Sequence, residues 1–222
     1  MFLPQYVPGG AANDRVAVPE PDLTYGYYQG RKYDYDSDDD TMSLFRRVQK
    51  LTCGELNPSM GTGHDAGYPF FIVDIAADGP REGGGLWAAT NQCLGGAAAC
   101  VEAINKLNRI VRQRGGPDVP QVDVTVFSIA ANQYTVELLV SYSAVEEQRC
   151  CYYTRRVASF LLCDPDHILK FRRYVLNILD WGNFQRLDQI LDAFNFLVEE
   201  ANQKRREEVM AGRDRIRPRP RK

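Results

Sequence analysis

Several residues and segments that mark particular protein classes are missing from this chain of 222 residues. Histidine occurs only at His64 and His167, which is too few for most histidine-rich metal sites. The six cysteines form no C-x-x-C pair, and this argues against a zinc ribbon. No apolar run approaches the roughly 20 residues that a membrane-spanning helix needs. The N-terminal sequence MFLPQYVPGG lacks the basic stretch and apolar run of a secretory signal.

These absences predict an intracellular protein, in the nucleus or the cytoplasm, that has no membrane partner. The cysteines are therefore expected to be reduced thiols, most of them buried. The glycine-rich segment DGPREGGG lacks the Lys-Ser/Thr of a P-loop and the G-x-G-x-x-G spacing of a dinucleotide site. Nucleotide binding at that segment is not expected.

Charge is distributed unevenly, although the formal net charge is only −2. Residues 1–80 carry 6 Lys/Arg and 12 Asp/Glu, whereas residues 201–222 carry 9 Lys/Arg and 3 Asp/Glu. The composition predicts an extended segment over 1–20, one domain over 21–206, and a basic, disordered tail over 207–222. Such a tail suits nucleic-acid contact, nuclear import or solubility alike.

Apolar periodicity divides the predicted domain into strands and helices. Strand patterns occur at 21–30, 68–77, 122–130, 134–143 and 148–162, and helical patterns at 41–51, 86–114, 164–182 and 183–206. The segment GGAAAC inside the second helix is poor in bulk and should let another backbone approach closely. The order of elements predicts an α/β or α+β fold, in which helices flank a mixed sheet and extra helices follow at the C-terminus.

Two acids stand on candidate strands, Asp22 after a proline and Asp74 inside a strongly apolar run. If the two strands are neighbours, the carboxylates can meet at one end of the sheet. Two carboxylates and a backbone carbonyl suit Mg²⁺, or Mn²⁺, which take oxygen ligands. Asp22 could instead cap a turn, Asp65 is a rival first ligand, and Asp78 is best explained as a turn residue.

Position 76 shares a face with Asp74, because alternate side chains of a strand point the same way. A lysine there would complete a hydrolytic site by positioning or deprotonating a water and by neutralising developing charge. The residue present is Ala76, which can neither carry charge nor transfer a proton.

These residues resemble the PD-(D/E)xK nuclease superfamily. The segments PDLTYGY, YPFFIVDIAADGP, LWAATNQCLGGAAACV and FRRYVLNILDWG are similar, over about residues 20–185, to a family of uncharacterised fungal domains assigned to that fold. The resemblance implies a restriction-endonuclease-like fold and cleavage of phosphodiester bonds, in DNA rather than RNA. It implies Asp22 and Asp74 as metal ligands, the backbone carbonyl of Ile75 as a third, and Gln92 beside the metal or substrate.

Ala76 departs from the pattern of that superfamily, whose active members have lysine at the matching position. Either the chain is a naturally non-catalytic relative, or the lysine was replaced because an active nuclease harms its host. Both alternatives predict a polypeptide that cleaves nucleic acid poorly and still binds Mg²⁺.

Basic side chains that could contact nucleic acid are Arg109 and Arg112 on the second helix and Arg155 and Arg156 in the last strand. The rival reading is a non-catalytic module that binds nucleic acid or a protein. Its C-terminal helices, which carry several phenylalanines, would then form a homodimer or partner surface.

Overall fold

The computed structural model describes most of the chain between residues 20 and 216. The described residues are 20–28, 40–52, 56, 66–76, 85–146 and 149–216. The elements follow the order β1 (Leu23–Tyr28), α1 (Asp40–Leu51), β2 (Ala66–Ile75), α2 (Leu86–Gly115), β3 (Val126–Ala131), β4 (Thr135–Glu146), β5 (Arg149–Leu161), α3 (Pro165–Trp181), a π-helix (Gly182–Arg186) and α4 (Leu187–Ile216). The elements predicted from periodicity are therefore present, and the α/β fold class is confirmed.

The five strands form one sheet in the order β1-β2-β3-β4-β5. Only the β2–β3 pair is parallel, and it is the pair whose connection contains α2. The other neighbours are antiparallel, so β3, β4 and β5 form a meander. The apolar run of β2 lies in the interior of the sheet, as a strand that both layers cover should.

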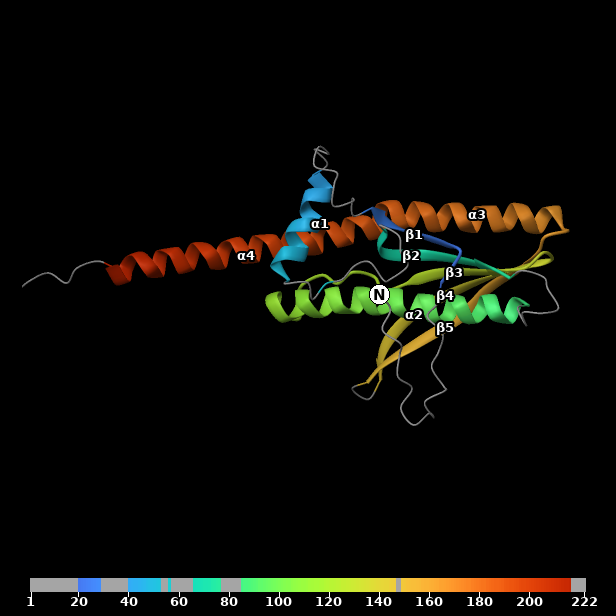
Figure 1. The fold of residues 1–222 in the computed structure, drawn as a ribbon, viewed down its shortest axis with the longest axis horizontal. Helices are drawn as coiled ribbons and strands as arrows, with labels where there is room; N and C mark the ends of the chain where they lie inside the picture. The colour runs from blue at the N-terminus through green and yellow to red at the C-terminus, as the bar shows by residue number, and fades with distance from the viewer. Residues whose placement is uncertain are drawn as a thin grey trace, which may run out of the picture.

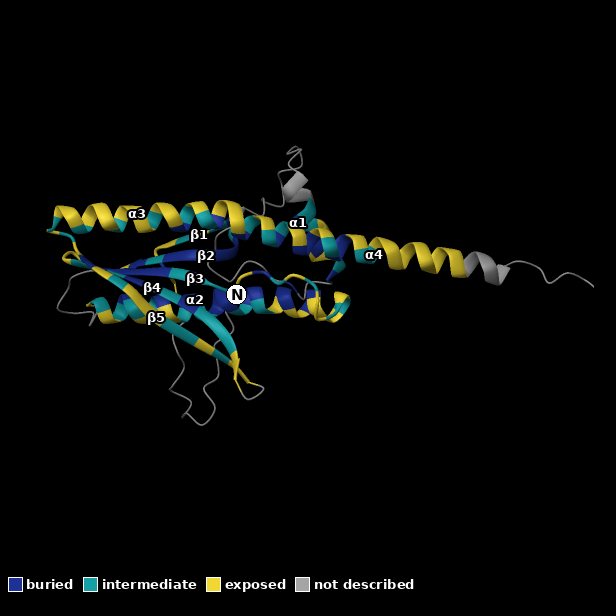
Figure 2. Cartoon of the chain, turned by 180° about the vertical axis from the view of Figure 1, so that it is seen from behind, coloured by how far each residue is buried: buried dark blue, intermediate teal, exposed yellow. Residues whose placement is uncertain are grey.

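Helices cover both faces of the sheet (Figure 1). Helix α2 lies on one face, against β2 and β3, and α3 with the first part of α4 lies on the other. The largest core cluster joins Phe70, Phe194, Leu197 and Ile104 with residues from most other elements. Burial follows these layers, and residues 202–211 of α4 extend past the sheet with exposed side chains (Figure 2).

The small residues of α2 let the helix approach β2 closely. A side chain added at Gly96 would place its Cβ 3.0 Å from Cδ1 of Ile72. Ala97 and Cys100 are fully buried against the same isoleucine. The sequence predicted a close approach of another backbone, whereas the neighbours at Gly96 are the side chains of Ile72 and Pro21.

The predicted break between the two C-terminal helices is wrong. Gly182 takes helical angles, φ −64° and ψ −42°, and a π-helix joins α3 to α4 without a turn. A Cβ on Gly182 would lie 2.1 Å from the ring of Phe70, and its carbonyl accepts a hydrogen bond from the Tyr27 hydroxyl at 2.7 Å. Glycine is required at this point because the core packs on it, not because the helix ends there.

Two further expectations change in detail. Helix α4 continues to Ile216, so the tail predicted as disordered from residue 207 begins as helix. The five cysteines that the structure describes are free thiols, as predicted, but only Cys93 and Cys100 are buried. Cys150, Cys151 and Cys163 are exposed or partly exposed because they lie in or just beyond the edge strand β5.

Candidate functional site

The pairing of β1 with β2 brings Asp22 and Asp74 together. Leu23 is paired with Val73 in antiparallel register, so the residues one step beyond, Asp22 and Asp74, stand opposite each other. Side chains in such positions are about 5 Å apart at Cβ. The Asp22 carboxylate is fixed by the backbone N–H of Ile75, which donates to its Oδ2 at 2.7 Å. The conditional expectation that these two strands are neighbours is therefore met.

Asp74 lies in an environment that opposes its charge. The residue is 9% exposed, and burial, with the Asp22 charge as a second cause, raises the pKa of its carboxyl from 3.8 to about 6. Within the described part of the chain, no lysine, arginine or histidine forms an ion pair with either carboxylate. Two adjacent carboxylates without a cation leave negative charge for a bound ion to neutralise.

Gln92 and Ala76 lie beside this pair. Gln92 Oε1 accepts a hydrogen bond from the backbone N–H of Glu20 at 3.2 Å, so α2 contacts the segment that leads into Asp22. Ala76 packs against a small apolar cluster that contains Ala89 and Cys93 of α2. Position 76 is therefore on the α2 face of the sheet, as alternation from Asp74 requires.

The donor set fits a hard divalent cation only in part. Two carboxylates on adjacent strands supply the oxygen ligands that Mg²⁺ prefers, and water or a substrate would complete its octahedron. No group of three or more His, Cys, Asp or Glu side chains suited to a metal occurs among the described residues. Asp65, Asp78 and His64 lie outside those residues.

Arg155 and Arg156 do not share a surface. Arg156 is paired with Leu139, whose side chain packs with Cys93 under α2, so Arg156 projects on the α2 face and Arg155 on the α3 face. The Arg156 guanidinium donates to Glu137 at 2.8 Å. A single nucleic-acid strand on one face of the sheet could therefore contact only one of these two arginines.

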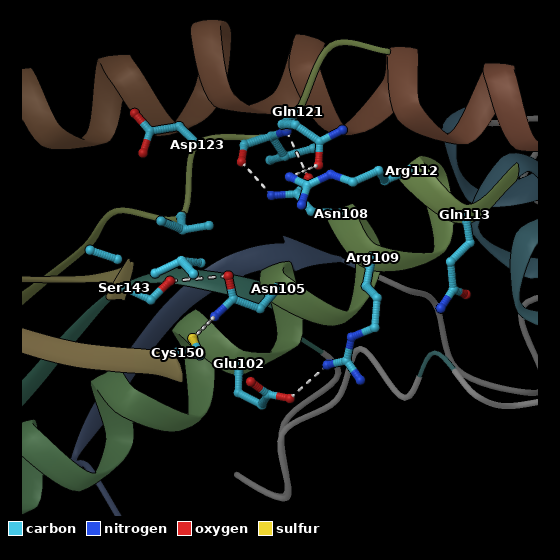
Figure 3. A pocket seen from close by; sticks show the side chains of 14 residues that line it. Glu102, Asn105, Asn108, Arg109, Arg112, Gln113, Gln121, Asp123, Ser143 and Cys150 are labelled. Carbon is cyan, nitrogen blue, oxygen red and sulfur yellow. Dashed lines mark hydrogen bonds and ion pairs between the residues drawn. The ribbon is translucent and has the colours of Figure 1, made fainter. Parts of the chain in front are cut away.

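Arg109 and Arg112 line a polar pocket (Figure 3). The pocket includes the segment just before β3, whereas Asp74 is paired with Ala130 near the end of that strand. The pocket has a volume of about 920 Å³ and lies between the C-terminal half of α2, the segment before β3 and the β4–β5 hairpin. Arg109 is about 25 Å from Gln92 along the helix axis, at 1.5 Å per residue. These two arginines and the carboxylate pair thus belong to separate sites.

The sequence interpretation missed Arg186, the largest fully buried side chain. Its guanidinium donates to the Thr125 carbonyl and lies 5.4 Å from the ring centroid of Trp181, but Nε and Nη2 have no partner. Burial lowers its pKa. Helical spacing could have revealed it, because 186, 190 and 197 fall on one stripe with the buried Ile190 and Leu197.

A comparison with known families identifies the chain at the level of a family. The family described as "Domain of unknown function (DUF7924)" matches residues 10–194, which is most of the chain. The chain belongs to the DUF7924 family. No curated protein and no solved structure matches it. The match covers β1 to β5, so both aspartates and the polar pocket belong to the DUF7924 domain, whereas most of α4 lies beyond it.

The helices of the described ranges were compared with the length and apolar character that a membrane span requires. None of those in the described ranges is long and apolar enough to cross a bilayer.

Proposed function

We propose that the DUF7924 domain of this chain is a metal-dependent nuclease domain of the PD-(D/E)xK type, and that the polypeptide with Ala76 is inactive. The observation that carries the proposal is the pair Asp22 and Asp74, opposite each other at the end of adjacent strands, with Asp74 buried. The substrate would be DNA rather than RNA, and the bond cleaved a phosphodiester. The restriction-endonuclease-like fold is part of this proposal.

Asp22 and Asp74 would hold Mg²⁺ or Mn²⁺, with the backbone carbonyl of Ile75 as a third ligand. The bound ion would activate a water and stabilise charge on a phosphodiester oxygen. Gln92, which already contacts the segment before Asp22, would orient a substrate or water next to the pair. The hydrogen bond from Ile75 N–H keeps the Asp22 carboxylate in place before any ion binds.

Ala76 is the reason for the proposed inactivity. Its methyl group packs against the apolar cluster of Ala89 and Cys93 and provides no proton donor or acceptor. A longer side chain at 76 would lie on the same face of the sheet as Asp74. A cation on that side chain would lie close to the carboxylate pair.

The packing of Ala76 also favours a second candidate, a non-catalytic module of the same fold that binds nucleic acid or a protein. An alanine that fits its apolar surroundings is what a domain without catalysis would have at this position. The two candidates differ in what a single substitution does. A nuclease site that lacks only its lysine should regain activity when lysine is placed at position 76, whereas the site of a non-catalytic module should not.

The experiment is the variant Ala76→Lys, incubated with supercoiled plasmid DNA and with structured RNA in Mg²⁺ or Mn²⁺. We expect metal-dependent cleavage by this variant, and little by the chain with alanine. The double variant Ala76→Lys/Asp74→Asn is the matched control and should be inactive, because it keeps the new cation and loses a carboxylate. If the folded Ala76→Lys protein cuts neither substrate, the nuclease proposal fails and the module remains.

A further inference from the structure

The polar pocket beside Arg109 and Arg112 has walls that are tied together by hydrogen bonds. Asn108 of α2 donates to the carbonyl of Val122 and accepts from its N–H, both at 2.8 Å, which fixes the segment before β3 onto the helix. Ser143 of β4 donates to Asn105 at 3.1 Å and fixes the hairpin to the same helix. The shape of the pocket is therefore set before a ligand arrives.

Spare hydrogen-bonding capacity remains on these walls. Among the described residues, Arg109 donates one N–H to Glu102 at 3.3 Å, and Arg112 donates one to Gln121 at 3.3 Å. Each guanidinium has five N–H donors, so most of theirs remain for a ligand. The two arginines are three residues apart, so they are neighbours on the helix surface and can hold one anionic group between them.

One acid of the pocket, Glu102, offsets the charge of Arg109, whereas Arg112 has no acidic partner among the described residues and is the cation left for an anionic ligand. Glu102 already accepts from Arg109 and from the Tyr152 hydroxyl, at 2.5 Å. Asp123 accepts from the Thr125 N–H through one oxygen and lies at the opposite end of the pocket from Arg109 (Figure 3). A ligand can therefore place an anion at the arginines and hydroxyl groups towards Asp123.

The lining also indicates which ligands do not fit. The described residues around the pocket include amides, a hydroxyl, a thiol and a few small apolar side chains, but no aromatic ring. Nucleobases and other flat rings are held by stacking on aromatic side chains, which this pocket does not offer. Its volume of about 920 Å³ is within the range of small-molecule sites.

We infer that this pocket binds a phosphorylated sugar, with the phosphate between Arg109 and Arg112 and the hydroxyls on the amide side chains and Asp123. The chemistry is shared by a free sugar phosphate and by the sugar–phosphate backbone of a nucleic-acid strand. The site is separate from the carboxylate pair, and its binding does not depend on the proposed nuclease activity.

Isothermal titration calorimetry of the full chain tests this inference, with D-ribose 5-phosphate as one probe and a short abasic oligodeoxynucleotide as the other. The abasic strand offers backbone without bases, and D-ribose and inorganic phosphate are the reference ligands. We expect the double variant Arg109→Ala/Arg112→Ala to weaken binding at least about tenfold, because charge-assisted bonds are lost. Lys106→Ala is the matched control, since it removes a charge from the same helix outside the pocket.

Each outcome decides the inference. Weaker binding by the double variant but not by Lys106→Ala supports the inference. The probe whose binding is weakened identifies the ligand as a free sugar phosphate or as a nucleic-acid strand. The inference is overturned if neither probe binds more tightly than D-ribose and inorganic phosphate. It is also overturned if the double variant and Lys106→Ala lose affinity equally, or if the double variant loses none. Repeating the titration with Asp22→Asn separates the two sites, because this variant disables the proposed metal centre and should leave the pocket unchanged.

Discussion

Replacing Asp22 with asparagine should make the metal-free protein more stable at neutral pH. The amide oxygen of Asn can still accept from the Ile75 N–H, so Asp22→Asn keeps the hydrogen bond at 2.7 Å and removes only the charge. Asp74 then no longer faces a second carboxylate. Burial is the larger cause of the raised pKa of Asp74, and the Asp22 charge is the smaller one. The gain in stability on removing the Asp22 charge therefore corresponds to less than half of the pKa shift.

The magnitude follows from the two charges. Unit charges about 5 Å apart interact by ~0.8 kcal/mol in bulk water and by ~3 kcal/mol at an effective dielectric constant of 20. Asp74 is next to the last residue of β2, and the smaller cause of its pKa shift cannot exceed half of about 3 kcal/mol. We expect a gain of about 1 kcal/mol at pH 7.5, or roughly 2–4 °C in Tm for a chain of this size.

The pH dependence is the sharper part of this prediction. The folded-state pKa of Asp74 is raised to about 6, so its contribution to stability is complete below pH 4 and is lost as the pH rises through 6. The gain from Asp22→Asn should therefore appear at pH 7.5 and vanish near pH 4, where Asp74 is protonated. In Mg²⁺ the order should reverse, because only the unmodified pair binds the ion.

Differential scanning calorimetry at both pH values, with EDTA and then with Mg²⁺, measures these differences. A destabilised Asp22→Asn protein at both pH values, with no effect of Mg²⁺ on either protein, would falsify the view that the two carboxylates share one site.

Two predictions concern the core. Gly182→Ala should lower the free energy of unfolding by about 2–3 kcal/mol in urea titrations, because its Cβ would overlap the Phe70 ring. Gly85→Ala at the N-cap of α2, where the Cβ would meet nothing within 4 Å, should cost about 1 kcal/mol or less, and equal losses would refute the packing argument. Arg186→Met should leave stability unchanged or raise it by about 1 kcal/mol, because a buried guanidinium with two unpartnered nitrogens is expensive. A loss above about 2 kcal/mol in the same titration would mean that its contacts with Thr125 and Trp181 outweigh desolvation.

Local patterns in the sequence were enough to predict the elements. Alternation and apolar runs located the strands, and α3 begins where Asp164 can cap it, with its carboxylate accepting from the N–H groups of Asp166 and His167. The exception was Gly182, where a pattern that usually ends a helix is compatible with helix because glycine also allows a close contact with Phe70. Local patterns do not distinguish these two uses of glycine.

The candidate site was predictable only as far as single strands allow. Alternation placed Asp74 and position 76 on one face, but the neighbour relation between β1 and β2 depends on the tertiary fold. Alternation alone places the neighbouring residues Arg155 and Arg156 on opposite faces of a strand, but the sequence interpretation grouped them as contacts of one nucleic acid. The polar pocket could not be foreseen, because Asn108, Val122 and Ser143 come from three separate segments that only the fold brings together.

The most direct measurement of the central claim is a crystal of the chain soaked with Mn²⁺ and examined by anomalous diffraction. We predict one octahedral ion that touches the carboxylates of both Asp22 and Asp74 and is lost in Asp74→Asn. The absence of an ion between the two residues, or carboxylates turned away from each other into separate salt bridges, would contradict a metal site at this end of the sheet.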